Sequence, residues 1–255
     1  MQITVHRMNE EALKNLLFRL ADDELIMGHR HSEWTGTAPI LEEDIALSSI
    51  AQDEIGHAQA YYTLLANLGA GQADDLAFTR QAGDFHCAQL CELPKGDWAS
   101  TIARQFFYDA AESVRLAALT NSGYAPLAQL ARKLSGEEKY HLLHARSWIK
   151  HLGHGTIESR LRLQAALDTL YPYALGLFEP PPDEAALVAD GILPPESELR
   201  DRWRVMIEPL LAEGRVIIVE APPTYGGRQG RHTEHLTKLL DDMQLVYRTD
   251  PQAEW

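Results

Sequence analysis

Two short motifs in the sequence place a carboxylate and an imidazole three residues apart. They are Glu54-x-x-His57 and Glu138-x-x-His141. Residues with this spacing lie on the same face of an α-helix, so each motif presents a carboxylate oxygen beside a ring nitrogen. These donors suit iron and manganese. One such motif arises by chance in many chains, whereas two in matching contexts indicate a metal site.

A further carboxylate precedes each motif by a similar distance. Glu24 lies 30 residues before Glu54, and Asp109 lies 29 residues before Glu138. One carboxylate and one Glu-x-x-His from each half of a bundle is the ligand plan of ferritin-like di-iron proteins. Four buried carboxylates without compensation would cost more than a domain's net stability of about 5–15 kcal/mol, and a pair of cations offsets their charge. The predicted ligands are Glu24, Glu54, His57, Asp109, Glu138 and His141.

Other titratable residues near these positions leave alternatives open. Glu112 lies one turn after Asp109, but it is only 26 residues from Glu138, so the symmetry of the two halves favours Asp109. Glu137 points about 100° away from Glu138 on a helix and is expected at the surface. His29 and His31 lack the helical offset to share a metal with Glu24 and are expected at the surface or at a helix end. The competing interpretation is that Glu54 and Glu138 are simply solvated.

The apolar pattern predicts the helices that would position these ligands. Apolar residues recur at steps of three and four, which favours an all-α fold. A connection over about 70–96 is too long for a plain turn and is expected to cross the end of a bundle, with a short helix near 86–90. Two helical hairpins joined by one crossover form a ferritin-like four-helix bundle. The four expected helices cover about 9–31, 41–68, 97–121 and 124–152.

The rest of the chain is expected to add helices to the same unit. Helical patterns cover about 156–178, with a kink at Pro172, and then 196–213 and 232–248. We therefore predict a single domain over 1–255. Its core bundle spans about 9–152 and its C-terminal helical extension about 153–255.

Composition narrows the class of protein. The net charge is −14, which disfavours contact with nucleic acid. Two cysteines cannot form a disulfide framework, which indicates a reducing, cytoplasmic setting. No apolar run approaches the roughly 20 residues that span a bilayer, so no membrane contact is expected.

Three further groups of residues have structural and functional interpretations. His86-Cys87-x-x-x-Cys91 offers sulfur and nitrogen donors, but three donors are thin evidence for zinc, and packing is favoured. His232 lies near the C-terminus, where helix capping or an interface role is favoured over metal binding. The acidic residues Asp22, Asp23, Glu42, Glu43 and Asp44 are expected on a solvated face, with contact to a basic partner subunit as the alternative.

Several longer segments resemble the PaaC-type subunit of ring-1,2-phenylacetyl-CoA epoxidase, and the likeness covers nearly the whole chain. They are Ser32-Glu33-Trp34 with Ala38-Pro39, Asp53-Glu54-Ile55-Gly56-His57, Asp75-Leu76-Ala77-Phe78-Thr79-Arg80, Thr101-Ile102-Ala103-Arg104-Gln105-Phe106 and His232-Thr233-Glu234-His235-Leu236.

The resemblance implies a ferritin-like fold and a multicomponent bacterial monooxygenase of aerobic phenylacetate catabolism. In that system a related PaaA-type subunit holds the di-iron site, a small PaaB-type subunit bridges the assembly, and a flavin and iron–sulfur reductase supplies electrons. The PaaC-type subunit is a structural partner with degenerate metal ligands. This sequence departs from that pattern because it carries a full PaaA-like ligand set, and the Asp in the third helix is itself a PaaA-like feature.

Three functions follow as hypotheses. The first is an oxygenase component that epoxidises the ring of phenylacetyl-CoA and carries two iron ions of its own, with manganese or a mixed pair as alternatives. The second is a non-catalytic partner of a PaaA-like subunit. The third, less favoured, is a metal-storage or ferroxidase bundle. A homo- or hetero-oligomer is expected, with PaaA-like and PaaB-like subunits, the reductase and an acyl-CoA substrate as partners.

Overall fold

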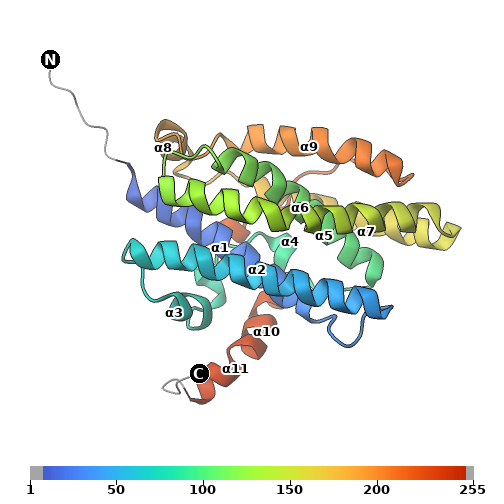
Figure 1. Cartoon of the computed structure of the whole chain (residues 1–255), viewed down its shortest axis with the longest axis horizontal. Coiled ribbons are helices and arrows are strands. Elements are labelled where there is room, and N and C mark those ends of the chain that lie inside the picture. The colour runs from blue at the N-terminus through green and yellow to red at the C-terminus, as the bar shows by residue number, and fades with distance from the viewer. Residues whose placement is uncertain (1–7, 251–255) are drawn as a thin grey trace.

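The computed structural model describes residues 8–250, and within that range it contains helices and no strand (Figure 1). Four long helices form a bundle in which α1 packs along α2 and α5 packs along α6. Their bounds agree with the four expected ranges to within about two residues. The all-α, ferritin-like prediction is confirmed. These helices are α1 (Glu10–Ser32), α2 (Leu41–Asn67), α5 (Trp98–Leu119) and α6 (Ala125–His154).

Local sequence signals set the starts of the bundle helices. The side chain of Asn9 accepts a hydrogen bond from the amide of Ala12 at 3.1 Å and caps α1. Asp97 caps α5 in the same way, with the amide of Ser100 at 2.9 Å. Each cap satisfies an amide that has no partner within the helix. Pro126 lies in the first turn of α6, where its missing amide costs nothing.

Helices α1 and α2 pack tightly against each other at Gly28. A Cβ atom at this position would lie 2.8 Å from the side chain of Ile55 and 3.1 Å from the carbonyl oxygen of Ala51. It would also lie 3.3 Å from Cβ of Glu54. The two helix backbones can therefore pack at this distance only because residue 28 has no side chain.

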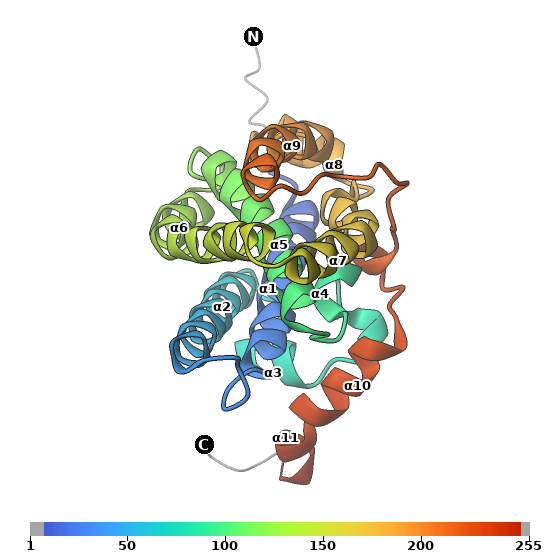
Figure 2. The ribbon, with the colours of Figure 1, turned by 90° about the vertical axis from the view of Figure 1, so that its right-hand side faces the viewer.

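Helix α5 lies at the centre of the molecule. Of its 22 residues, 17 are buried, because α6 packs on one side and α7 (Ile157–Leu175) and α9 (Glu196–Glu213) pack on others. Figure 2 shows this arrangement along the length of the bundle. Because neighbours cover α5 on several sides, polar side chains such as Gln105, Asp109 and Glu112 are enclosed together with its apolar ones.

Trp203 joins the C-terminal extension to the bundle. Its side chain is fully buried, and its indole N–H donates to the carbonyl oxygen of Phe107 at 3.1 Å. Its ring lies 5.7 Å from that of Phe107, 6.1 Å from that of Tyr171 and 5.2 Å from that of Phe178. These contacts come from α5, α7 and the 3-10 turn η2 (Gly176–Phe178), so one aromatic core spans both regions.

The connection between α2 and α5 carries short helices instead of a plain loop. These are α3 (Ala73–Phe78), the 3-10 turn η1 (Ala82–Asp84) and α4 (Gln89–Glu92). A short helix was expected near 86–90, and the structure places it slightly later, as α4, which shares only residues 89 and 90 with that range. Arg80 fixes this connection to the bundle, because its guanidinium pairs with Asp22 and donates to the Tyr62 hydroxyl at 2.8 Å.

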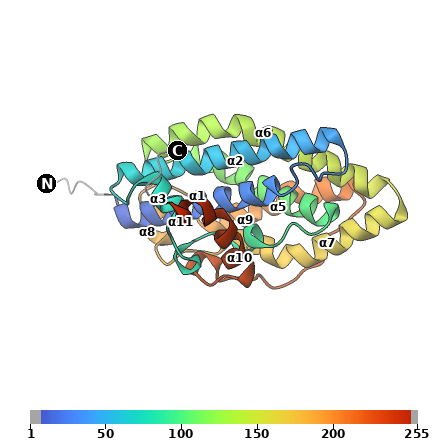
Figure 3. The same cartoon turned by 90° about the horizontal axis from the view of Figure 1, so that it is seen from below.

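The C-terminal extension runs back along the outside of the bundle (Figure 3). Helix α7 contains Pro172 and leads into η2. The helix expected over 232–248 is divided in two at Gln244. The remaining elements are α8 (Glu184–Ala189), η3 (Gly227–Gln229), α10 (Glu234–Met243) and α11 (Leu245–Thr249). Across the described range, no helix combines the length and apolar character needed to cross a membrane.

Candidate metal centre

The six predicted ligands lie on the inward faces of the four bundle helices. Each side chain belongs to a residue that is at most 2% exposed. Glu24 comes from α1 and Asp109 from α5, while α2 and α6 each contribute a Glu and a His. Buried charge of this density requires compensation. The structure therefore places the residues as the helical spacing predicts.

Glu138 and the two histidines form the middle of the group. Nδ1 of His57 lies 3.3 Å from Oε2 of Glu24 and 3.3 Å from Oε1 of Glu138. Nδ1 of His141 lies 3.2 Å from the same Oε1 of Glu138. The two imidazole rings face each other, with centroids 6.1 Å apart. Ligand atoms of Glu24, His57 and Glu138 all lie within 4.8 Å of one another, while the other three predicted ligands fall outside that group.

The unpartnered polar atoms of these six side chains test whether the site fits a metal. Every one of the six has at least one buried oxygen or nitrogen that makes no hydrogen bond of good geometry among residues 8–250, although Nδ1 of each His lies 3.2–3.3 Å from a carboxylate oxygen. Buried polar atoms are normally hydrogen-bonded, so a cluster of exceptions requires an explanation. Oxygens and imidazole nitrogens left free together are the donor set for iron or manganese. The atoms are Glu24 Oε2, Glu54 Oε1, His57 Nδ1, both Oδ of Asp109, both Oε of Glu138 and His141 Nδ1.

Both histidines are oriented by a carboxylate from the opposite motif. Nε2 of His57 lies 2.8 Å from Oε2 of Glu137, and Nε2 of His141 lies 3.3 Å from Oδ2 of Asp53. A proton on Nε2 donates to the carboxylate and leaves Nδ1 as the free donor atom, which is the usual outer contact of a metal-binding His. Glu137 lies at the surface as expected, with its side chain 46% exposed, and from there it also contacts His57.

A sequence signal for these two orienting acids was available. Asp53 and Glu137 each stand directly before the Glu of a Glu-x-x-His motif. The repeat is therefore an acid pair followed by His, present once in each half of the chain. Within a single motif, the first acid (Asp53 or Glu137) points away from the helix face that carries the predicted ligands. Its contact with the opposite helix becomes visible only when α2 and α6 are placed side by side.

The structure distinguishes the roles of Asp109 and Glu112. The carboxylate of Glu112 forms a buried ion pair with Arg115 on the same helix. Arg115 Nη2 also lies 3.9 Å from Glu196 of α9, and Glu196 accepts from Arg19 of α1 at 2.7 Å. Both oxygens of Asp109 are buried and have no partner in the described part of the chain. Glu112 is occupied in an ion-pair network, which supports Asp109 as the donor on α5.

His31 lies in the last turn of α1, which agrees with the expected helix-end position, and it also contacts a predicted ligand. It is fully buried, and its Nδ1 lies 2.7 Å from Oε2 of Glu54. The offset from Glu24 to His31 is seven residues, or two turns, so both lie on the same face of α1. The sequence-based expectation considered the shorter offsets only and missed this relationship.

Burial and neighbouring charges raise the pKa values of four members of the site. Burial raises the pKa of Glu24 to about 8 and the pKa of Asp109 well above its usual range. Burial disfavours the charged form of His57, but contact with Glu138 and Glu24 outweighs it and raises the pKa of His57 to about 12. Burial likewise opposes the charged form of His141, and Glu138 overcomes it and raises the pKa to about 10. Protons on these groups balance negative charge in the metal-free protein, and bound cations would displace them.

The consecutive acids of α1 are not on a solvated face, so that expectation is wrong. Asp22 and Asp23 are at most 1% exposed. Asp22 pairs with Arg80, and Asp23 pairs with Arg228 at 2.7 Å, a residue close to the C-terminal end of the chain. Burying these carboxylates is tolerated because each has a guanidinium partner.

A four-helix bundle with carboxylates and histidines facing its interior defines a ferritin-like protein of the carboxylate–histidine class. The chain belongs to the phenylacetic acid catabolic protein family, whose model matches residues 2–255. It is 36% identical over 239 residues to the C subunit of 1,2-phenylacetyl-CoA epoxidase from Escherichia coli strain K12, covering 93% of this chain and 96% of that protein. It is 26% identical over 166 residues to the A subunit of the same epoxidase, covering 62% of this chain and 53% of that protein. The family resemblance seen in the sequence is confirmed.

Proposed function

We propose that this chain is a component of a multi-subunit oxygenase that acts on phenylacetyl-CoA and that it holds two iron ions of its own. The observation that carries the proposal is the set of unpartnered buried donor atoms on all six predicted ligands. Membership in the phenylacetic acid catabolic family supplies the reaction class. The names of its relatives supply the substrate. Manganese or a mixed pair fits the same donors.

In this proposal the chain's residues hold the metals and keep water out. Glu138, which lies between the two histidines, would hold metal together with Glu54, its counterpart on α2. Glu24 and Asp109 complete the two halves of the site. Glu137 and Asp53 keep Nδ1 of each His directed at the centre through their contacts with Nε2. Iron bound there would supply the oxygen chemistry.

The proposed partners follow from the two relatives. Likeness to both the C and the A subunits of one epoxidase supports assembly with related bundle subunits. We propose a PaaA-like partner, a small PaaB-like subunit and a flavin and iron–sulfur reductase that supplies electrons.

A non-catalytic role beside a PaaA-like subunit is the second candidate. The observation that favours it is the longer and stronger likeness to the C subunit of the epoxidase than to its A subunit. The two candidates differ in whether the six ligands of this chain are needed for turnover.

Metal analysis of the purified chain is the first test. Expressed alone with iron supplied, the chain should contain about two equivalents of iron, and a Glu54→Ala, Glu138→Ala double variant should contain almost none. Glu42 is an exposed acid on α2, the helix that carries Glu54. Glu42→Gln is therefore the matched control and should retain iron. Negligible iron in the unmodified chain would refute the proposed metal centre.

Activity of the assembled complex is the second test. The complex is reconstituted with reductase and phenylacetyl-CoA, and either the unmodified chain or the double variant is included. Loss of product formation with a complex of unchanged size supports catalysis at this site. Full activity with the double variant assigns the chain the structural role.

A further inference from the structure

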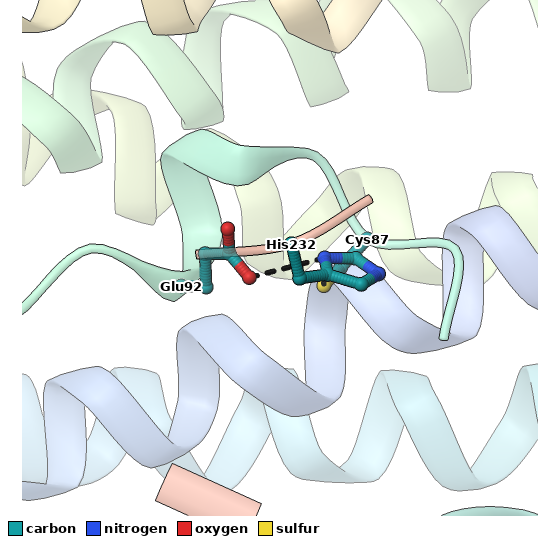
Figure 4. A group of neighbouring side chains, drawn as sticks. All are labelled: Cys87, Glu92 and His232. Atoms are coloured by element: carbon teal, nitrogen blue, oxygen red, sulfur yellow. Dashed lines mark hydrogen bonds and ion pairs between the residues drawn. The ribbon is translucent and has the colours of Figure 1, made fainter. Parts of the chain in front are cut away.

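A second group of possible metal ligands lies outside the bundle centre. It consists of Cys87, Glu92 and His232, whose donor atoms all lie within 4.8 Å of one another. Figure 4 shows Cys87 and Glu92 on the connection between α2 and α5, with His232 reaching them from the segment before α10. His232 is 140 residues from Glu92 in the chain. Cys87 and Glu92 are fully buried, and the His232 side chain is 4% exposed.

The backbone around the group is held in place by independent contacts. Arg30 of α1 donates to the carbonyl oxygen of Glu92 at 2.7 Å and to that of His235 at 3.2 Å, so one guanidinium binds both segments. Gly227 packs against the same connection, where a Cβ would lie 2.3 Å from the carbonyl oxygen of Cys87. The three side chains are therefore brought together by surroundings that do not depend on their own mutual contacts.

The outer contacts of the group leave one donor atom of each residue facing the others. Nε2 of His232 lies 2.9 Å from the carbonyl oxygen of Phe85, which fixes its proton on that nitrogen. Oε1 of Glu92 accepts from the amide of Thr233 at 2.8 Å. Three atoms are left to face a metal ion, and they are Nδ1 of His232, Oε2 of Glu92 and Sγ of Cys87. A backbone carbonyl on the far nitrogen of an imidazole is a common arrangement of a metal-binding His.

The distances fit a tetrahedral zinc ion. When a nitrogen and a sulfur ligand bind one tetrahedral zinc ion at ordinary bond lengths, the two atoms lie about 3.6 Å apart. A nitrogen and a carboxylate oxygen bound to the same ion lie about 3.4 Å apart. Here Nδ1 of His232 lies 4.0 Å from Sγ of Cys87 and 3.0 Å from Oε2 of Glu92. Each separation differs from the tetrahedral value by about 0.4 Å, which small side-chain rotations supply.

The charge of the ligand set also fits a divalent cation. A thiolate and a carboxylate carry two negative charges together, and a neutral imidazole adds none, so a dication makes the buried group neutral. Sulfur, nitrogen and oxygen together favour zinc over magnesium or calcium, which prefer oxygen alone. We propose that Cys87, Glu92 and His232 bind one zinc ion, with water in the fourth position. The metal fastens the segment before α10 to the connection between α2 and α5.

The test uses cobalt as a spectroscopic substitute for zinc in the reduced, full-length chain. The Glu54→Ala, Glu138→Ala double variant serves as background, so that the bundle centre does not contribute. One equivalent of Co²⁺ should produce a sulfur-to-cobalt absorption band that added Zn²⁺ abolishes. Cys87→Ser should abolish the band, and Cys91→Ser should retain it. Cys91 is the matched control because it is equally buried but contacts Asp23, with Sγ 3.5 Å from Oδ1.

Two further measurements keep the outcome clear if Cys87→Ser fails to fold. His232→Gln should weaken Zn²⁺ binding and remove the rise in the midpoint of thermal unfolding that Zn²⁺ gives the background protein. Binding should release a proton from the thiol and one from the imidazolium, so log K should rise by about two per pH unit below their pKa values. Absence of the band in the background protein, or its persistence in Cys87→Ser, would overturn the zinc site.

Discussion

Nε2 of His57 lies 2.8 Å from a carboxylate oxygen of Glu137 on the opposite helix, and Asp53 makes the reciprocal contact with His141. The two acids thus determine which ring nitrogen each histidine presents to the bundle centre. Neither is one of the six proposed ligands. Their contribution can therefore be measured apart from the loss of a ligand.

Removing these orienting acids should weaken metal binding without unfolding the chain. Glu137→Gln and Asp53→Asn should each lower iron affinity by about 10- to 100-fold, because the imidazole loses its fixed orientation. Glu42→Gln on α2 provides the control for removal of an acid. The measurement is metal competition with a chelator, combined with circular dichroism to confirm the helical fold. Unchanged affinity in both variants would show that these contacts do not support metal binding.

Substitutions at Asp109 and Glu112 should have opposite effects. Asp109→Asn should reduce iron content to about one equivalent or less while leaving the fold intact, because both its oxygens are free for metal. Glu112→Gln should retain iron but lower the free energy of unfolding by about 3 kcal/mol, because Arg115 loses its buried partner. Metal analysis and denaturant unfolding distinguish the two. Loss of iron in Glu112→Gln with retention in Asp109→Asn would reverse the assignment.

His31 should contribute to stability even though it was not predicted at the site. In His31→Ala the carboxylate of Glu54 loses the 2.7 Å contact within the buried interior. The metal-free protein should be destabilised by about 1–3 kcal/mol, the usual cost of an unsatisfied buried group. His29→Ala, two residues earlier and partly exposed, is the comparison. Equal unfolding midpoints for the two variants would argue against the importance of the His31 contact.

We propose that the bundle and its C-terminal extension fold as one unit, and Trp203 tests this. Trp203→Ala should lower the free energy of unfolding by about 3–5 kcal/mol, the usual effect of truncating a buried Trp. Unfolding followed by helical signal and by aromatic fluorescence should remain a single coincident transition. Two separate transitions, with only one of them shifted, would show independent domains.

The sequence predicted the bundle well because its helices carry strong local signals. Asn9 and Asp97 are good caps, and α9 begins and ends at the residues expected for it. The short helices α3 and α8 have six residues each and too little periodicity to predict. The last expected helix was correct in type, but the structure divides it at Gln244, a turn residue whose dihedral angles stay in the right-handed helical region.

The predictions about the site were limited because spacing along one helix gives no information about contacts with neighbouring helices. Same-face spacing is a local property, so the inward positions of the six ligands could be predicted from it. Contacts of Glu137, Asp53 and His31 depend on the neighbouring helix, which a spacing rule on one element does not contain. Asp23 was assigned to a solvated face because its partner, Arg228, lies 205 residues further along the chain. No local pattern connects residues that far apart.

Gly28 affects the geometry of the proposed metal centre. It lies one turn beyond Glu24, and the space its absent side chain leaves is filled by Ile55 and Ala51 of α2. The gap between the two helix axes is thus fixed where the ligand positions of α1 and α2 face each other. A larger residue at position 28 would push α1 away from α2. The 3.3 Å separation of Glu24 from His57 would then increase. The distance between the proposed ligands of α1 and α2 is therefore set by a residue whose side chain cannot itself bind metal.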